Sequence, residues 1–285
     1  MVARILTTVI GIPLAVFLIL YPGGMPFACA IGTVAFLGAL EFYGHVRKTG
    51  TRPVEWAGLS AVVLFVVSAR TYHGSEIGAI FPAVLTFLLI LSFCVEMGRK
   101  DRSPIQNVGV TLLGAIYVGW LISHLVVLRG ITGRQLTIFS WTKEPGAWLV
   151  MFTFLCAWAC DISAFLVGRK YGTKKIAPSL SPHKTVEGSV AGLIGSVLVA
   201  MVVGIFVIKL PPQHAFALGV TFGVLCQLGD LSESTIKRQL SIKDFGTVVP
   251  GHGGVLDRFD GLLFAAPAAY YYTVLFLGHW LRHGL

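Results

Sequence analysis

The chain has 285 residues, of which 55% are hydrophobic and only 12% are charged, and its formal net charge is +9. Soluble domains carry about twice that fraction of charged residues, so the composition excludes a soluble globular protein and predicts an all-α integral membrane protein. The positive charge does not call for a nucleic-acid partner, because basic loops are normal in membrane proteins.

Nine apolar runs have about the length of a membrane-spanning helix, which needs about 20 residues. In chain order they cover residues 5–21, 27–43, 54–69, 77–97, 105–128, 147–167, 188–208, 215–231 and 261–281. The first run resembles a signal peptide, with Ala28-Cys29-Ala30 as its cleavage site, but its length favours a first span. We therefore predict about nine spans, five of them in residues 1–146 and four in residues 147–285.

Lysine and arginine are distributed unevenly among the predicted loops. With the N-terminus in the cytoplasm, sixteen of the 22 basic residues lie on the cytoplasmic side and six lie outside. Cytoplasmic loops are enriched in these residues, so we predict that the N-terminus is inside and the C-terminus is outside. The charged segments 168–187 and 232–260 are then predicted as cytoplasmic loops.

Several predicted spans carry glycines at intervals of three to five residues. These are Gly109, Gly114 and Gly119 in one run, and Gly188, Gly192 and Gly195 in another. Glycines at such spacing let neighbouring helices approach closely, so we interpret both groups as packing positions. No internal repeat stands out, which disfavours a transporter built from two related halves.

Acidic residues concentrate in the second half of the chain, where seven of the thirteen fall between Asp161 and Asp260. Asp161 and Asp230 lie within or at the end of predicted spans. A carboxylate at the centre of a membrane helix costs about 2.5–3.5 kcal/mol on insertion scales, so it usually faces a cavity or a partner. For Asp161, a structural contact between helices remains the alternative.

Spacing predicts which of these groups come together. A helix continuing past Asp230 would carry on one face Asp230, Glu233, Ser234 and Lys237. Asp257 and Asp260 are three residues apart at the start of the last predicted span. Carboxylates at helix ends are the oxygen ligands that Mg²⁺ needs, together with substrate phosphate oxygens. Alternatively, some of these acids only neutralise nearby basic residues.

Two segments have the composition of phosphate-binding sites. The turn Pro250-Gly251-His252-Gly253-Gly254 precedes a predicted helix, and the N–H groups of such a turn attract anions. Residues 181–188 bring hydroxyl groups, a lysine and a glutamate to the start of another helix. Glycine turns are common and basic loops also anchor topology, so neither segment is specific by itself.

Taken together, these residues resemble the signature of the phosphatidate cytidylyltransferases, also called CDP-diacylglycerol synthases. The matching positions are Ser234, Ile236, Lys237, Arg238, Lys243, Asp244, Gly246, Pro250, His252, Gly253, Gly254, Asp257, Arg258 and Asp260. Asp161 with Gly168, residues 181–188 and residues 229–234 also look like segments of that family. The motifs cover roughly residues 150–265, and the N-terminal half carries little that is specific to the family.

The resemblance implies transfer of CMP from CTP to phosphatidic acid, giving CDP-diacylglycerol and pyrophosphate, in a reaction that depends on Mg²⁺. It implies the metal ligands Asp230, Asp257 and Asp260, with Asp161 as a further candidate. It implies catalytic roles for Lys237, Arg238, Lys243, Asp244, His252 and Arg258. The implied substrate contacts are Ser181, Lys184, Thr185, Glu187, Glu233, Ser234, Gly253 and Gly254.

A second cation is consistent with this number of acids, and a homodimer is compatible with the same observations. The expected location is a bacterial plasma membrane, with the active site facing the cytoplasm, where CTP from water meets a lipid that stays in the bilayer.

Three other functions fit parts of the pattern. A lipid kinase that uses CTP would share the nucleotide but release CDP. A CDP-alcohol phosphotransferase would need a longer aspartate motif beginning Asp-Gly, which does not occur in this sequence. A cation-coupled transporter would use Asp161 and Asp230 as ion sites near mid-membrane, whereas the polar residues of this chain gather at one predicted face.

Overall fold

The computed structural model describes residues 2–71, 80–138, 141–246 and 253–283. The first half contains the helices α1 (Val2–Leu20), α2 (Met25–Lys48), α3 (Glu55–Thr71), α4 (Ile80–Met97), α5 (Pro104–Gly114) and α6 (Leu121–Arg129), with the π-helical segment η2 (Ala115–Trp120) joining α5 to α6. The strands β1 (Leu136–Ile138) and β2 (Trp141–Lys143) form a short antiparallel pair.

The second half is also mainly helical. It contains α7 (Pro145–Tyr171), the antiparallel strands β3 (Lys175–Ala177) and β4 (Ser181–Thr185), α8 (Val186–Met201), the π-helical segment η3 (Val202–Ile208), α9 (Pro212–Gln239), the 3₁₀ turn η4 (Leu256–Arg258), α10 (Asp260–Phe276) and α11 (Gly278–His283). The helical character predicted from composition is confirmed, with two short β-hairpins added to it.

The chain forms two compact units, which are described separately. One unit consists of Met1–Val127 and Gln239–Phe259, and the other consists of Leu128–Arg238 and Asp260–Leu285. Each unit therefore combines an early and a late part of the sequence. The charged segment expected at 232–260 is divided between the two units.

Six helical segments among the described residues are long and apolar enough to cross a membrane. They are α2, α4, Pro104–Arg129, α7, Val186–Ile208 and α9. α3 and α10 have 17 residues each, and the apolar part of α1 covers Val9–Leu20. Within the described residues, each of the nine predicted apolar runs overlaps a helix, whereas the count of nine spans and the orientation remain predictions.

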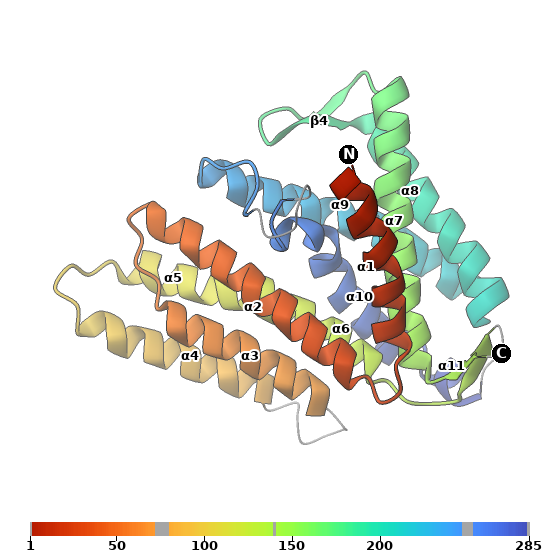
Figure 1. The fold of residues 1–285 in the computed structure, drawn as a ribbon, viewed down its shortest axis with the longest axis horizontal. Helices are drawn as coiled ribbons and strands as arrows, with labels where there is room; N and C mark the ends of the chain where they lie inside the picture. The colour runs from red at the N-terminus through yellow and green to blue at the C-terminus, as the bar shows by residue number, and fades with distance from the viewer. Residues whose placement is uncertain (1, 72–79, 139–140, 247–252, 284–285) are drawn as a thin grey trace. The chain divides into compact units, whose positions relative to one another are not determined.

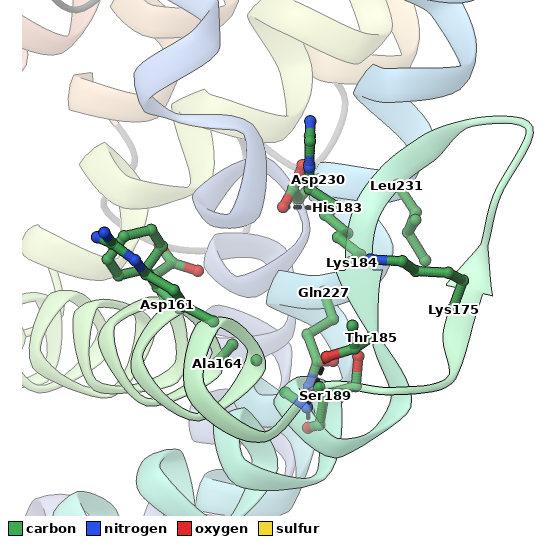
Figure 2. Close-up of a pocket in the computed structure, with 15 residues that line it drawn as sticks. Asp161, Ala164, Lys175, His183, Lys184, Thr185, Ser189, Gln227, Asp230 and Leu231 are labelled. Atoms are coloured by element: carbon green, nitrogen blue, oxygen red, sulfur yellow. Dashed lines mark hydrogen bonds and ion pairs between the residues drawn. The ribbon is translucent and has the colours of Figure 1, made fainter.

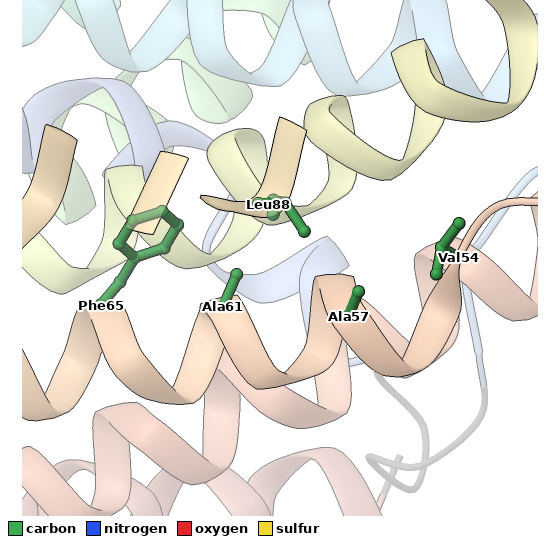
Figure 3. Packing of buried hydrophobic residues seen from close by; sticks show 6 residues of the cluster. Val54, Ala57, Ala61, Phe65 and Leu88 are labelled. Carbon is green, nitrogen blue, oxygen red and sulfur yellow. The ribbon is translucent and has the colours of Figure 1, made fainter. Parts of the chain in front are cut away.

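In the first unit, α3 packs against α4 and η2 (Figure 1). Figure 3 shows one buried cluster at this interface, made by Val54, Ala57, Ala61, Phe65 and Leu88. The small side chains of Ala57 and Ala61 allow the helices to approach, and the fully buried Phe65 ring fills the space beside them. This packing makes α3 a central element of the unit although it is short for a span.

Glycines of the second unit lie where α7 and α8 pack side by side (Figure 1). A Cβ atom on Gly188 would lie 2.8 Å from the carbonyl oxygen of Ala164, and one on Gly192 would lie 3.0 Å from that of Cys160. The close approach predicted for this group is confirmed. In the first unit it is confirmed for Gly119, which abuts Val62, but not for Gly109, whose Cβ position has no atom within 4 Å.

Two local expectations need correction. α9 continues to Gln239, so residues 232–239 are helical rather than the start of a loop. An ion pair of 3.4 Å between Lys237 and Glu233, one turn apart, favours this extension. Asp257 belongs to the 3₁₀ turn η4, whereas Asp260 begins α10, so these two acids do not share one helix.

Candidate active site

The second unit contains a pocket of about 580 Å³ beside the end of α7. Its lining residues come from α7, the β3–β4 hairpin, α8 and α9, and Figure 2 labels ten of them. The charged and polar members are Asp161, Arg169, Lys175, His183, Lys184, Thr185, Ser189, Gln227 and Asp230. Phe165 and Leu231 add apolar surface. This size and mixture of groups suit a small, charged organic ligand.

Lys184 and Asp230 meet at this pocket, as Figure 2 shows. Lys184 Nζ lies 2.5 Å from Asp230 Oδ2, and the two side chains are 26% and 36% exposed. The pair joins the strand β4 to α9. Both side chains line the pocket, although the Nζ atom of Lys184 is itself buried against Asp230.

Asp230 also belongs to an acidic cluster with Glu233 and Asp260. One carboxylate oxygen from each of these residues lies within 4.8 Å of the others. α9 supplies Asp230 and Glu233 from one face, as the spacing predicted, and the first residue of α10 supplies Asp260. Glu233 is fully buried and Asp260 Oδ1 accepts a hydrogen bond of 2.7 Å from the N–H of Gly261. Three clustered carboxylates are a suitable donor set for a hard divalent cation.

The β3–β4 hairpin positions Lys175, His183 and Lys184, which are basic residues of the pocket lining. Lys175 pairs with Thr185 and Ala177 pairs with Ser181, so the segment expected as a loop is a short antiparallel ribbon. Thr185 is the N-cap residue of α8, and its Oγ1 accepts a hydrogen bond of 3.2 Å from the N–H of Gly188. This cap fixes the start of α8, and Lys184 lies two residues before that helix.

Two residues expected in the site, Glu187 and Arg238, make local contacts in this structure. Glu187 accepts hydrogen bonds from the hydroxyl and N–H of Thr173 and from the N–H of Lys174, so it fastens the chain that leaves α7. Arg238 Nε donates to the carbonyl of Leu180 at 2.9 Å, which ties the end of α9 to the hairpin. Ser234 is buried on α9 and is not part of the pocket lining.

The signature residues from Lys243 to Arg258 belong to the first unit, whereas Asp260 belongs to the second. Asp257 Oδ2 accepts hydrogen bonds from the N–H of Phe245 at 2.8 Å and from the N–H of Gly254 at 2.9 Å. Gly253 has a φ of +91°, a backbone conformation that favours glycine. In this structure the Asp257 carboxylate, rather than an external anion, accepts the N–H of Gly254.

The charged neighbours of this turn are exposed. Lys243, Asp244 and Arg258 all present their side chains at the surface of the first unit. His252 lies outside the described residues, together with the preceding part of the predicted glycine turn. Asp161 lines the pocket of the second unit, but it is not a member of the acidic cluster.

Two functional candidates were missed from the sequence. Gln227, one turn before Leu231, lines the pocket and its Nε2 donates to the carbonyl of Ser189 at 3.0 Å. Glu41 on α2 accepts hydrogen bonds from the signature turn of the first unit. Both are polar residues within apolar runs, and this is the sequence feature from which they could have been identified as candidates.

Comparison of the sequence with known proteins identifies the family of this chain. The sequence model of the cytidylyltransferase family matches residues 2–276. A phosphatidate cytidylyltransferase of Synechocystis sp. is 36% identical over 96% of this chain and 97% of its own length. That of Bacillus subtilis is 31% identical with the same coverage, and the chloroplastic phosphatidate cytidylyltransferase 4 of Arabidopsis thaliana is 31% identical over 92% of this chain and 70% of its own length. The chain therefore belongs to the cytidylyltransferase family.

Proposed function

We propose that this membrane protein is a CTP:phosphatidate cytidylyltransferase, which makes CDP-diacylglycerol and pyrophosphate for phospholipid synthesis. An oxygen of the phosphatidate phosphate forms a bond with the α-phosphorus of CTP. The bond from that phosphorus to the bridging oxygen of the β-phosphate breaks, and pyrophosphate leaves. The observation that carries the proposal is the polar pocket of the second unit, which combines basic groups with a carboxylate of the acidic cluster.

The acidic cluster fits a divalent cation because its donors are all carboxylate oxygens and converge within a small volume. Asp230, Glu233 and Asp260 of the second unit would hold Mg²⁺, with Asp161 of the same unit as a further candidate. Asp257, in the first unit, is retained as a proposed ligand. Bound Mg²⁺ would neutralise charge on the phosphate oxygens that it contacts. The structure supports Glu233 for this role, which sequence reasoning had given to substrate binding.

Basic side chains would bind the phosphates of the two substrates. Lys184 is the first candidate, because it lines the pocket and already pairs with a carboxylate. Lys237, Arg238, Lys243 and Arg258 complete the proposed set, with Asp244 and His252 shaping their surroundings. Phosphoryl transfer requires positioning and charge neutralisation rather than a covalent nucleophile, and this is the chemistry that such side chains provide.

Hydroxyl and backbone groups would complete the binding of substrate. Ser181 and Thr185 from β4, Ser234 from α9 and the glycines Gly253 and Gly254 are the proposed contributors, and Glu187 supports them by fastening the chain next to the hairpin. We further propose that the site faces the cytoplasm of a bacterial plasma membrane and that a second cation takes part. A homodimer remains compatible with these features.

The test is a product assay on purified, detergent-solubilised protein with CTP, Mg²⁺ and phosphatidate. The expected result is equal amounts of pyrophosphate and a CDP-linked lipid, both abolished by a chelator and restored by excess Mg²⁺. Release of CDP with a newly phosphorylated lipid, when a lipid alcohol replaces phosphatidate, would identify a kinase instead. Absence of nucleotide turnover under all of these conditions would overturn the proposal.

A further inference from the structure

Glu41 is an acidic residue in an unusual place. It lies on α2, one of the helices long and apolar enough to span a membrane, and it is half-buried. An acidic side chain within such a helix is unfavourable by about 2.5–3.5 kcal/mol at the membrane centre unless it has polar partners. Its partners therefore indicate why the chain can accommodate it.

Those partners are two consecutive backbone amides of the signature turn. Glu41 Oε1 accepts a hydrogen bond of 3.0 Å from the N–H of Val255, and Oε2 accepts one of 3.1 Å from the N–H of Leu256. These amides lie at the start of η4, which ends at Arg258. The first N–H groups of a helical turn have no partner within the turn and interact favourably with a carboxylate.

One face of α2 contacts the same segment at helical spacing, from Gly38 through Glu41 and Phe42 to His45. A Cβ atom on Gly38 would lie 3.7 Å from Leu256 Cδ1. The ring centroid of the buried Phe245 lies 6.4 Å from that of Phe42 and 5.9 Å from that of His45. Residues three, four and seven apart share a helix face, so one face of α2 packs against this segment.

Two glycines of the signature, Gly246 and Gly254, lie against Glu41. A Cβ atom on Gly254 would lie 2.6 Å from Glu41 Oε2, and one on Gly246 would lie 3.0 Å from Glu41 Cδ. Larger residues at these positions would displace the carboxylate from the amides that it binds. The position of the Glu41 carboxylate therefore depends on glycine at both positions.

This arrangement separates the apolar residues of the turn from its charged residues. Phe245, Val255 and Leu256 are at most 6% exposed, whereas Lys243 and Arg258 point outward at the surface. Glu41 and Asp257 together bind the N–H groups of Phe245, Gly254, Val255 and Leu256. Two carboxylates thus fix the backbone from which the charged side chains project.

We propose that Glu41 is a positioning residue for the cytidylyl transfer, acting through the turn of residues 253–258 that it fastens to α2. This inference rests on the proposed function, and it assigns a role in the reaction to the N-terminal half of the chain. Glu41 itself contacts no reacting atom. Its contribution is to keep the turn in one conformation, so that Asp257 and Arg258 are placed before substrate arrives.

The test uses the full-length protein in detergent, with Glu41→Gln as the main variant and Glu96→Gln as the matched control. Glu96 is also an acid in an apolar helix of the same unit. Its carboxylate accepts hydrogen bonds from the N–H of Ser103 and from Nδ2 of Asn107, in a turn that carries no signature residue. Two quantities are measured, the kcat of CDP-lipid formation and the hydrogen exchange of the amides of Val255 and Leu256 in protein without Mg²⁺.

In Glu41→Gln, the amide side chain can accept only through one oxygen and places an NH₂ group against a backbone N–H. We expect exchange of these two amides to become at least about ten-fold faster. We expect kcat to fall about ten- to hundred-fold, since small displacements of catalytic groups have effects of this size, with a smaller change in KM for CTP. Glu41→Asp keeps the charge and is expected to restore part of both quantities. Glu96→Gln is expected to leave kcat and both amides unchanged.

The outcomes separate the inference from the proposed function. Faster exchange with unchanged kcat would show that Glu41 is only structural and would overturn the positioning role. Unchanged exchange would show that Glu41 does not hold the turn. If Glu41→Gln fails to fold, Gly246→Ala tests the same contact from the other side. Its methyl group would lie 3.0 Å from Glu41 Cδ and 3.3 Å from the Cα of Gly254, so it would displace the carboxylate. Unchanged exchange and kcat in this variant would also overturn the inference. A wild-type protein without turnover would contradict the proposed function, while the exchange measurement would still decide whether Glu41 fastens the turn.

Discussion

Lys184 and Asp230 form an ion pair of 2.5 Å that connects the strand before α8 with α9. Asp230 is also one of the three clustered carboxylates. The basic group proposed to bind phosphate and the acidic group proposed to bind Mg²⁺ are thus direct neighbours. The lysine therefore neutralises part of the charge of the cluster.

Replacing Lys184 tests its proposed role toward phosphate. Lys184→Met keeps most of the side-chain volume but removes the charge, and we expect kcat/KM for CTP to fall about 100-fold, the size of effect seen when one group that stabilises transition-state charge is lost. Lys184→Arg is expected to retain more activity than Lys184→Met. Lys100→Met, in an exposed loop, is the control and should leave kcat/KM unchanged. Equal activity of Lys184→Met and the wild type would contradict the assignment.

Replacing the clustered acids tests the proposed metal site. We expect Asp230→Asn and Asp260→Asn each to lower kcat by at least about 100-fold, because a neutral amide is a poor ligand for Mg²⁺. The measurement is the parallel formation of pyrophosphate and CDP-linked lipid. Asp101→Asn is the control, since its side chain is 86% exposed and pairs only at 3.7 Å with Arg52. Normal turnover in both cluster variants would exclude the cluster as the catalytic metal site.

Metal binding to the same cluster is also measurable without substrate. A cation that binds only the folded protein stabilises it by about 2.7 kcal/mol at a concentration of 100 times its Kd. We therefore expect millimolar Mg²⁺ to raise the melting temperature of the wild-type protein in detergent. Asp230→Asn should show a much smaller increase. An equal increase in both proteins would indicate that Mg²⁺ stabilises the fold at some other position.

Asp257 is proposed as a metal ligand and is observed as a hydrogen-bond partner of the backbone, and these two roles are separable. Asparagine retains an oxygen that can accept the N–H groups of Phe245 and Gly254, but it lacks the charge. We expect Asp257→Asn to reduce kcat about 100-fold or more while the exchange of the Gly254 amide changes little. Rapid exchange of the Gly254 amide together with normal turnover of Asp257→Asn would contradict the role of Asp257 as a metal ligand.

The space around each glycine predicts different effects on stability for two substitutions, one between α7 and α8 and one on α5. In Gly188→Ala the new methyl group would meet the carbonyl of Ala164 at 2.8 Å and the Cα of Gly168 at 3.1 Å. Backbone atoms cannot move aside easily, so we expect destabilisation of about 1–3 kcal/mol and a lower melting temperature. Gly109→Ala, where no atom lies within 4 Å, is expected to leave stability unchanged or to raise it by up to about 1 kcal/mol. Equal melting temperatures for the two variants would contradict the packing argument.

The sequence by itself determined the class of the protein and much of its site. Its low charge and long apolar runs require helices in a membrane, because no other regular structure satisfies the backbone of such runs within a single segment. The spacing of Asp230 and Glu233 was sufficient to place both on one face of α9, since a helix has a fixed period. The signature from Ser234 to Asp260 indicated the family because its residues are specific in both type and interval.

Only the tertiary structure decided which distant residues meet. It pairs Lys184 with Asp230 and brings Asp260 close to Asp230 and Glu233 of α9. It also places Asp257 in a turn that is hydrogen-bonded to Glu41. Helical periodicity relates residues up to about two turns apart, whereas Glu41 and Val255 are separated by 214 positions. Such contacts depend on how whole helices pack against one another, and for that reason the role of the N-terminal half could not be predicted from its sequence.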